Sequence, residues 1–90
     1  MYRLTYNFDS LNRHGVSIAN VDEVIGTGIW EELPLSVRGN ERLMFIGFTS
    51  NGRLLEIGVE YFDDNQIEHV FHADDATNRN RIIFRNRVRK

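Results

Sequence analysis

The sequence predicts a single α+β domain in which an antiparallel β-hairpin follows two short helices. Two observations lead to this fold class. Apolar residues recur at helical spacing in the first third of the chain. In the middle, Asn51-Gly52 separates two apolar runs, and this dipeptide is typical of hairpin turns. The 90 residues contain no repeat, low-complexity stretch or interdomain linker. Residues 1–90 are therefore expected to form one domain.

The first element is expected to be a helix from Thr5 to Arg13, with Thr5 as its N-cap. Gly15 is expected to end it. The helical spacing i, i+4 and i+7 is shared by three apolar residues, Leu4, Phe8 and Leu11.

A second helix is expected directly after Ser17, which precedes an apolar face and is a favoured capping residue. In our interpretation, Gly26, Thr27 and Gly28 close this helix. A short extended piece, residues 29–33, then leads to Pro34, and residues 34–40 are expected to form a loop. The apolar face of the helix consists of Ile18, Val21, Val24 and Ile25.

The hairpin turn also predicts a strand register. A two-residue type I′ loop gives Asn51 and Gly52 positive φ angles and sets Ser50 opposite Arg53. Counting outward from the loop predicts six core residues in facing pairs, Phe48 with Leu55, Ile46 with Ile57 and Met44 with Val59. The other face would carry Phe45, Gly47, Thr49, Leu54, Glu56 and Gly58. Its two glycines indicate either weak strand packing or the close approach of a backbone or ligand.

A third antiparallel strand is expected from Ile67 to Ala73, after a turn at residues 63–66. Beyond Ala73 the local patterns disagree. Asp74 or Asp75 is a suitable cap for a helix. Arginines at odd positions and apolar residues at even ones instead alternate as in a half-buried strand.

Charge is distributed unevenly along the chain. Residues 1–78 contain five arginines and thirteen acidic residues, a net charge of −8, whereas residues 79–90 contain five arginines, Lys90 and no acid, a net charge of +6. Such a basic segment suits nucleic-acid phosphates, an acidic partner protein or the acidic body of the chain itself.

The composition favours a cytoplasmic protein. The chain has no cysteine, which excludes a disulfide framework and a cysteine-bearing zinc site. No apolar run approaches the roughly 20 residues of a membrane span. The N-terminal stretch has no signal-peptide pattern. We therefore expect neither export nor a membrane-embedded segment.

Three stretches of the chain resemble the BrnT-type toxins, small RelE-like ribonucleases of bacterial toxin-antitoxin pairs. They are His14-Gly15-Val16-Ser17 followed by Val21 to Ile25, Glu41 to Gly58 around Asn51-Gly52-Arg53-Leu54-Leu55, and Val70 to Thr77 with its Ala-Thr pair.

The resemblance implies a RelE-like fold, a three- to four-stranded antiparallel meander with a C-terminal helix at about residues 75–87. It also implies RNA cleavage and an antitoxin that contacts the basic surface, through which homo-oligomers would assemble. The chain differs from the family pattern at Asp74 and Asp75, where carboxylates would repel a phosphate. An inactive or repurposed relative is the alternative reading.

RNA cleavage without a metal needs a base for the 2′-hydroxyl, an acid for the leaving oxygen and cations for the phosphorane charge. His72 suits either proton role, and it stands at the strand end where the family's site lies. Its alternative role is a structural hydrogen bond. The candidate catalytic residues are His72, Arg53, Arg79 and Tyr61, and the candidate binding residues are Arg81, Arg85, Arg87, Arg89 and Lys90.

Other polar groups carry weaker signals. A regular strand would place His69 on the opposite face from His72, so the two should not act together. His14 precedes Gly15 and is expected to lie near the C-terminal end of a helix, where its charge would interact favourably with the helix dipole. We assign it no catalytic role. Residues 63–65 lack the glycine and distant glutamate of a calcium loop, so we expect no metal and no cofactor. The rival to a ribonuclease is a non-catalytic bacterial module that binds protein or nucleic acid through its basic C-terminal segment.

Overall fold

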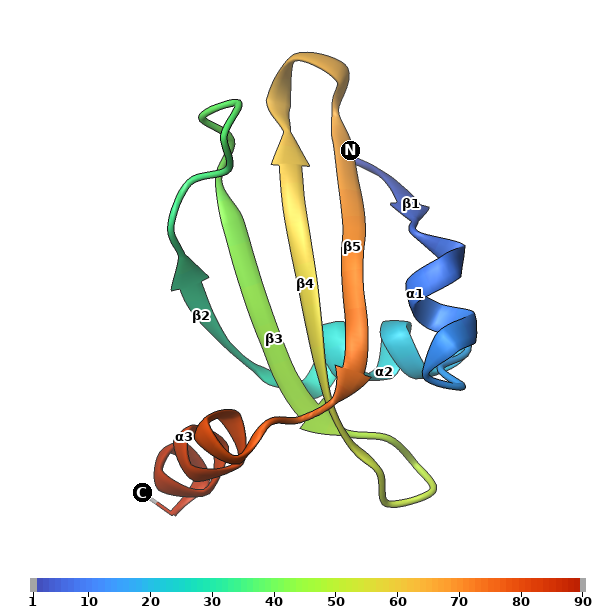
Figure 1. Ribbon diagram of the computed structural model, residues 1–90. Helices are drawn as coiled ribbons and strands as arrows, with labels where there is room; N and C mark the ends of the chain where they lie inside the picture. The colour runs from blue at the N-terminus through green and yellow to red at the C-terminus, as the bar shows by residue number, and fades with distance from the viewer. Residues whose placement is uncertain (1, 90) are drawn as a thin grey trace.

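A five-stranded mixed sheet with three helices forms the protein, seen in a computed structural model that describes residues 2–89 (Figure 1). The strand order is β1-β5-β4-β3-β2, and only the β1–β5 pair is parallel. The strands are β1 (Arg3–Tyr6), β2 (Ile29–Leu33), β3 (Arg42–Phe48), β4 (Leu54–Phe62) and β5 (Ile67–Asp75). The helices are α1 (Phe8–Arg13), α2 (Ile18–Thr27) and α3 (Asn78–Val88), with a 3₁₀ turn, η1 (Asp63–Asn65), between β4 and β5.

The predicted α+β class and the β3–β4–β5 meander are confirmed, but the sheet is larger than predicted. Residues 29–33 pair with β3 as a fourth strand. The predicted helix from Thr5 was wrong in its first half, because Arg3–Tyr6 pairs with β5 as strand β1. Helix α1 begins only at Phe8, and its N-cap is Asn7, whose side chain accepts from the Ser10 N–H.

The second helix was predicted correctly in place and cap. Ser17 and Asn20 form a reciprocal capping box at the start of α2. Val21 and Val24 are fully buried against the sheet, whereas Ile18 at the first turn is exposed. Gly15 has a φ of +63°, which fits its predicted role in ending α1.

The predicted hairpin register was wrong by one residue. Thr49 N–H donates to the Arg53 carbonyl at 2.8 Å, so the loop contains three residues, 50–52, and Phe48 faces Leu54. Only Gly52 has a positive φ, +85°, while Asn51 does not. The Thr49 hydroxyl donates a hydrogen bond to the Asn51 side chain. This bond holds Asn51 in the turn, directly before Gly52 in its left-handed conformation.

This shift moves half of the predicted core to the other side of the sheet, because side chains alternate along a strand. We call the side covered by α1 and α2 the inner face. It carries Leu43, Phe45 and Gly47 on β3 with Leu55, Ile57 and Val59 on β4. The outer face carries Arg42, Met44, Ile46 and Phe48 on β3 with Leu54, Glu56, Gly58, Glu60 and Phe62 on β4.

The two glycines of the hairpin have different roles. A Cβ at position 47 would lie 2.9 Å from the Cα of Gly28, so Gly47 allows the end of α2 to approach β3 closely. A Cβ at position 58 would lie 2.7 Å from the ring of Phe71. The predicted close approach of a backbone is therefore correct at Gly47, whereas the neighbour of Gly58 is a side chain.

A β-bulge in β5 changes which residues share a face. His72 pairs with Gly58 and Val70 pairs with Val59, so Phe71 is an extra residue without a partner on β4. His69 pairs with Glu60 and therefore lies on the outer face with His72. The expectation that the two histidines point to opposite faces was wrong, because it assumed a regular strand.

The C-terminal segment is a helix, which confirms the element implied by the resemblance to BrnT-type toxins. Its cap is Thr77, whose side chain accepts from the Asn80 N–H, and neither Asp74 nor Asp75 caps it. Both aspartates instead belong to β5. Ala76, Ile83 and Phe84 pack with the apolar end of the outer face. Within residues 2–89, no helix is both long and apolar enough to cross a membrane.

Candidate active site

Glu56 is the centre of a hydrogen-bond network on the outer face. Its side chain is buried, and one carboxylate oxygen, Oε1, accepts from the Thr77 backbone N–H at 2.7 Å and from Asn80 Nδ2 at 2.9 Å. The other oxygen, Oε2, lies 2.9 Å from His72 Nε2. Burial alone would raise the pKa of Glu56, but hydrogen bonds from Thr77, Asn80 and His72 outweigh burial and lower it. Glu56 is therefore a buried carboxylate that stays charged.

His72 lies at the boundary between this buried carboxylate and solvent. Its side chain is 32% exposed, against 6% for Glu56. Because Nε2 faces Glu56, Nδ1 is the ring nitrogen left for another partner. The carboxylate orients the imidazole ring through this contact. The arrangement allows His72 to exchange a proton with a bound molecule.

The network continues into α3 through Asn80. Arg79 Nη1 donates to Asn80 Oδ1 at 3.3 Å, so an arginine joins the group that holds His72. The Arg79 side chain is 76% exposed and lies 3.9 Å from Glu31 on β2. Glu31 also lies 3.6 Å from Arg87. His72 and Arg79 are thus the two predicted catalytic residues that the structure connects.

The other two predicted catalytic residues lie elsewhere. Arg53 donates to Asp75 at 2.9 Å, to the Gly15 carbonyl at 2.7 Å and to the His14 carbonyl at 2.6 Å, which ties the α1–α2 turn to the end of β5. Tyr61 belongs to the inner-face set and packs against its core. Burial, followed by the charges of nearby glutamates, raises the pKa of Tyr61 to about 12. Its hydroxyl is a poor proton donor at neutral pH.

The aspartates that depart from the BrnT pattern are each paired with a positive or ionisable group. Asp74 lies 3.2 Å from His14 Nδ1, and Asp75 lies 2.9 Å from Arg53 Nε. The hydrogen bond from Arg53 is the main cause that lowers the pKa of Asp75. Arg53 offsets the negative charge that would repel a phosphate at this strand end. His14 lies near the C-terminal end of α1 as predicted, and its side chain contacts Asp74.

Helix α3 presents most of the predicted binding residues to solvent. Only Asn80 is buried within it. Arg87 contacts Glu31 and donates to the Trp30 carbonyl at 3.3 Å, so part of the basic segment neutralises the acidic body, as one alternative proposed. Among residues 2–89, Arg81, Arg85 and Arg89 form no ion pair. Lys90, also predicted to bind, lies outside the described residues.

Sequence reasoning missed the residues that organise the site. Glu56 was predicted to share a face with Phe45, Gly47 and Thr49, but it lies opposite Ile46 on the outer face. It received no role, Thr77 was named only within the Ala-Thr pair, and Asn80 was not considered. One signal was present, because Glu56 is the only charged residue between Leu54 and Val59. A charge inside a buried strand requires partners.

No protein-family model matches the chain, and no curated protein is similar to it in sequence. Within residues 2–89, no three histidine or acidic side chains come close enough together to hold a metal ion.

Proposed function

We propose that this protein is a BrnT-like toxin of a toxin-antitoxin pair, an endoribonuclease that cleaves RNA without a metal ion. One observation carries the proposal. His72, a partly exposed histidine, is held by buried Glu56, which also anchors the first turn of the arginine-bearing helix α3. The network thereby links a proton-transfer group to the helix that carries the arginines, and phosphodiester cleavage by the RNA's own 2′-hydroxyl requires both kinds of group.

In the proposed reaction, His72 accepts the proton of the 2′-hydroxyl through Nδ1. The 2′-oxygen attacks phosphorus, the bond to the 5′-oxygen breaks, and that oxygen takes a proton from water. The products are a 2′,3′-cyclic phosphate and a 5′-hydroxyl. Glu56 stabilises the imidazolium that forms, and Arg79 offsets the charge on the phosphorane. His72 is the catalytic residue, whereas Glu56 and Asn80 are positioning residues.

The partner of such a toxin is an antitoxin, and we place both in the bacterial cytoplasm. The arginines of α3 are the proposed contact, because an acidic antitoxin segment would neutralise them and cover the approach to His72. A homo-oligomer would then form through the antitoxin. The test is expression in bacteria with and without the neighbouring reading frame.

We expect growth arrest that the neighbouring protein relieves and that His72→Ala abolishes. His14→Ala is the matched control, because His14 is also a partly exposed histidine, 28%, beside a carboxylate. Arrest by both variants, or no arrest by the unaltered protein, would contradict the toxin assignment.

A second candidate is a non-catalytic module that binds an anionic partner through α3. The observation in its favour is that, among residues 2–89, Arg81, Arg85 and Arg89 of this segment form no ion pair, so their charges are available to a partner. Anion binding that His72→Ala leaves unchanged, without RNA cleavage by the unaltered protein, would favour this candidate.

A further inference from the structure

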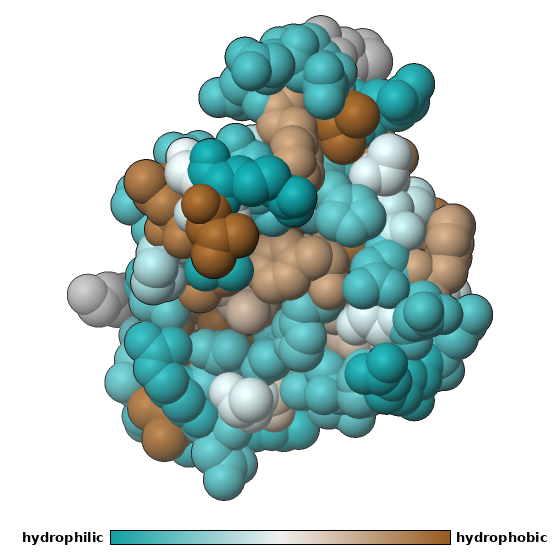
Figure 2. Space-filling model, turned by 45° about the horizontal axis from the view of Figure 1, so that its top comes forward, coloured by the Kyte–Doolittle hydropathy of each residue, from teal (hydrophilic) through white to brown (hydrophobic). Residues whose placement is uncertain are grey.

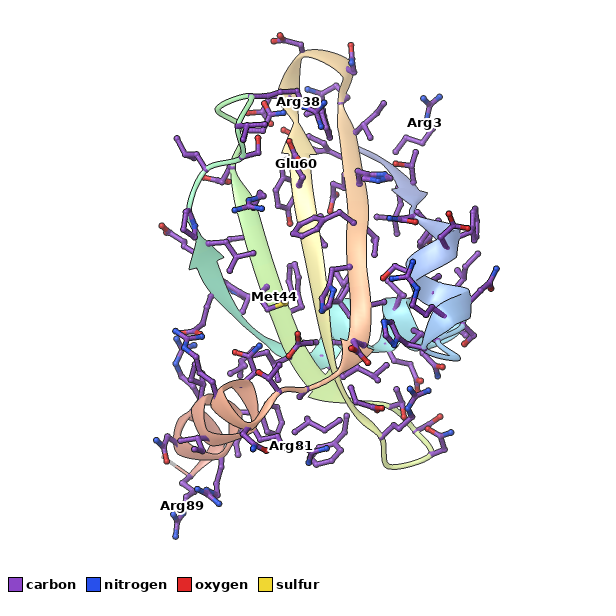
Figure 3. The ribbon with its side chains drawn as sticks, in the orientation of Figure 1. Arg3, Arg38, Met44, Glu60, Arg81 and Arg89 are labelled. Atoms are coloured by element: carbon purple, nitrogen blue, oxygen red, sulfur yellow. The ribbon has the colours of Figure 1, made fainter. Side chains whose placement is uncertain are left out.

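The outer face is left open beyond the end that α3 covers. Figure 2 shows apolar side chains gathered in a hollow on this side of the molecule, with hydrophilic residues around them. In Figure 3, Arg38 and Glu60 lie at one end of the face, Met44 lies near its middle, and Arg81 lies at the other end, on α3. The open part therefore extends from the candidate active site toward η1.

Two arginine–phenylalanine pairs occupy this open part. The guanidinium of Arg42 lies 5.5 Å from the ring centroid of Phe71, and that of Arg38 lies 5.2 Å from the ring centroid of Phe62. These distances are within the range of cation–π contacts. The Arg38 side chain is 67% exposed, whereas Arg42 Nε donates to the Pro34 carbonyl at 2.9 Å.

The bulge in β5 has a direct effect on this surface. It turns Phe71 onto the outer face beside His72, and Gly58 leaves room for the ring to lie against β4. Phe62 lies four residues further along β4 than Gly58, which corresponds to about 13 Å at the usual rise of a strand. Two aromatic rings therefore follow His72 along a single face.

A hollow of about 340 Å³ adjoins Phe62, which is within the size range of sites for small ligands. It offers an aromatic ring, an imidazole and an amide within one concave surface, together with an arginine. Its lining residues are Thr5, Arg38, Phe62, Asn65, Ile67 and His69.

We infer that this face binds the unpaired bases of single-stranded RNA, one stacked on Phe71 and another on Phe62. The inference rests on the proposed ribonuclease function and names its substrate as a single strand. Aromatic rings on an open sheet commonly bind RNA by stacking, and bases paired in a duplex cannot reach them. Arg42 and Arg38 lie beside these rings, where their guanidinium groups can meet the phosphates of the stacked nucleotides.

The acidic groups nearby are compatible with neutral bases. Glu60 is buried, accepts from Asn40 Nδ2 at 2.9 Å and lies 3.8 Å from Arg38. Asp63 and Asp64 line a neighbouring hollow of about 420 Å³ that shares Arg38, Phe62 and Asn65 with the first one. Because these two aspartates would repel phosphates, the phosphates are expected to lie beside Arg38 and Arg42.

The experiment measures anisotropy of a labelled ten-nucleotide RNA whose 2′-O-methyl groups prevent cleavage. We expect Phe62→Leu and Phe71→Leu each to weaken binding by roughly 5- to 150-fold, the range for loss of one stacked base. Leucine keeps apolar packing while removing the aromatic face. Phe8→Leu is the control, because Phe8 is an exposed ring on α1 stacked near Tyr6, and it should bind as the unaltered protein does.

Two further nucleic-acid probes distinguish binding to unpaired bases from binding to the phosphate backbone. A strand of the same length without bases, and a duplex of the same sequence, should both bind at least tenfold more weakly than the single strand. Equal binding of all three probes, no binding at all, or unchanged affinity in both phenylalanine variants would overturn the inference, and an acidic protein would then be the better partner for the arginines.

The results distinguish failure of the base-stacking inference from failure of the proposed ribonuclease function. RNA cleavage with unchanged affinity in both phenylalanine variants would remove the stacking sites and leave the ribonuclease. Base-dependent binding without cleavage would remove the ribonuclease and leave the stacking sites.

Discussion

Replacing Glu56 with alanine should destabilise the protein strongly, because its carboxylate is the partner of three hydrogen-bond donors. It accepts from the Thr77 N–H ahead of α3, from Asn80 inside α3 and from His72 on β5. Asn80 is 7% exposed, so its amide has little access to water once Glu56 is removed. The variant would leave buried donors unpaired at the point where α3 joins the sheet.

The expected fall in the free energy of unfolding follows from the number of donors that lose their partner. An unpaired buried polar group costs about 1–3 kcal/mol. Asn80 Nδ2 is buried and the hydrogen bond from the Thr77 N–H is partly buried, and entry of water into the vacated space offsets part of the loss. We expect the free energy of unfolding to fall by about 2–4 kcal/mol, a large share of the roughly 5–13 kcal/mol expected for a chain of this length.

The assay is urea denaturation followed by circular dichroism. With a slope of roughly 1.5 kcal/mol per M, the midpoint should fall by about 1–3 M. His72→Ala should shift it much less, because His72 is partly exposed and its loss leaves Glu56 with two donors. A fall of less than about 0.5 kcal/mol on Glu56→Ala, within the range of ordinary surface substitutions, would refute the network as the anchor of α3.

Three further predictions concern pH, backbone packing and salt. The pKa of Glu56 lies below its ordinary value of 4.5, so its contribution to stability is complete above that pH and is lost as pH falls through the lowered pKa. Acid titrations of the unfolding midpoint should show a flatter decline in Glu56→Gln. Gly47→Ala should destabilise the protein by about 1–3 kcal/mol, because the added Cβ would collide with the backbone of Gly28. Thermal unfolding midpoints measure this loss. Gly26→Ala in α2 has open space and should stabilise by about 0.5–1 kcal/mol. Exchanging Arg81 and Arg85 for glutamine should flatten the log–log salt dependence of RNA binding by about 1.4, and an unchanged slope would exclude phosphate contacts at both.

The elements that were predictable from the sequence are those with complete local signals. The second helix has an N-cap, an apolar face and a glycine end, and the structure contains all three features. The first strand had no such signal. Arg3–Tyr6 is extended because it pairs with β5, about 60 residues later in the sequence, and this tertiary pairing overrides the helical spacing of Leu4 and Phe8.

Two errors of a single residue had the largest effect on the site. A three-residue loop in place of a two-residue loop exchanged the faces of β3, although Asn51-Gly52 itself was correctly placed in the turn. The bulge at Phe71 brought His69 to the face of His72. Neither the loop length nor a bulge leaves a distinct pattern in the composition of neighbouring residues, so alternation alone could not reveal them.

The helix after β5 was predictable through the resemblance to BrnT-type toxins, and it carries the residues that link Arg79 to His72. Local alternation favoured a strand for the same residues. The helix is stabilised by a contact distant in sequence, from Glu56 to Thr77 and Asn80. Such a contact is invisible to local periodicity, which explains why Glu56 was overlooked.

The most direct test of the ribonuclease proposal is cleavage of a natural single-stranded RNA by the purified protein in the presence of EDTA. We expect products with 2′,3′-cyclic phosphate and 5′-hydroxyl ends, a loss of about 100-fold or more in rate on His72→Ala, and an unchanged rate on His14→Ala. Undiminished cleavage by the folded His72→Ala variant would contradict the proposed role of this histidine. No cleavage by the unaltered protein would contradict the ribonuclease itself.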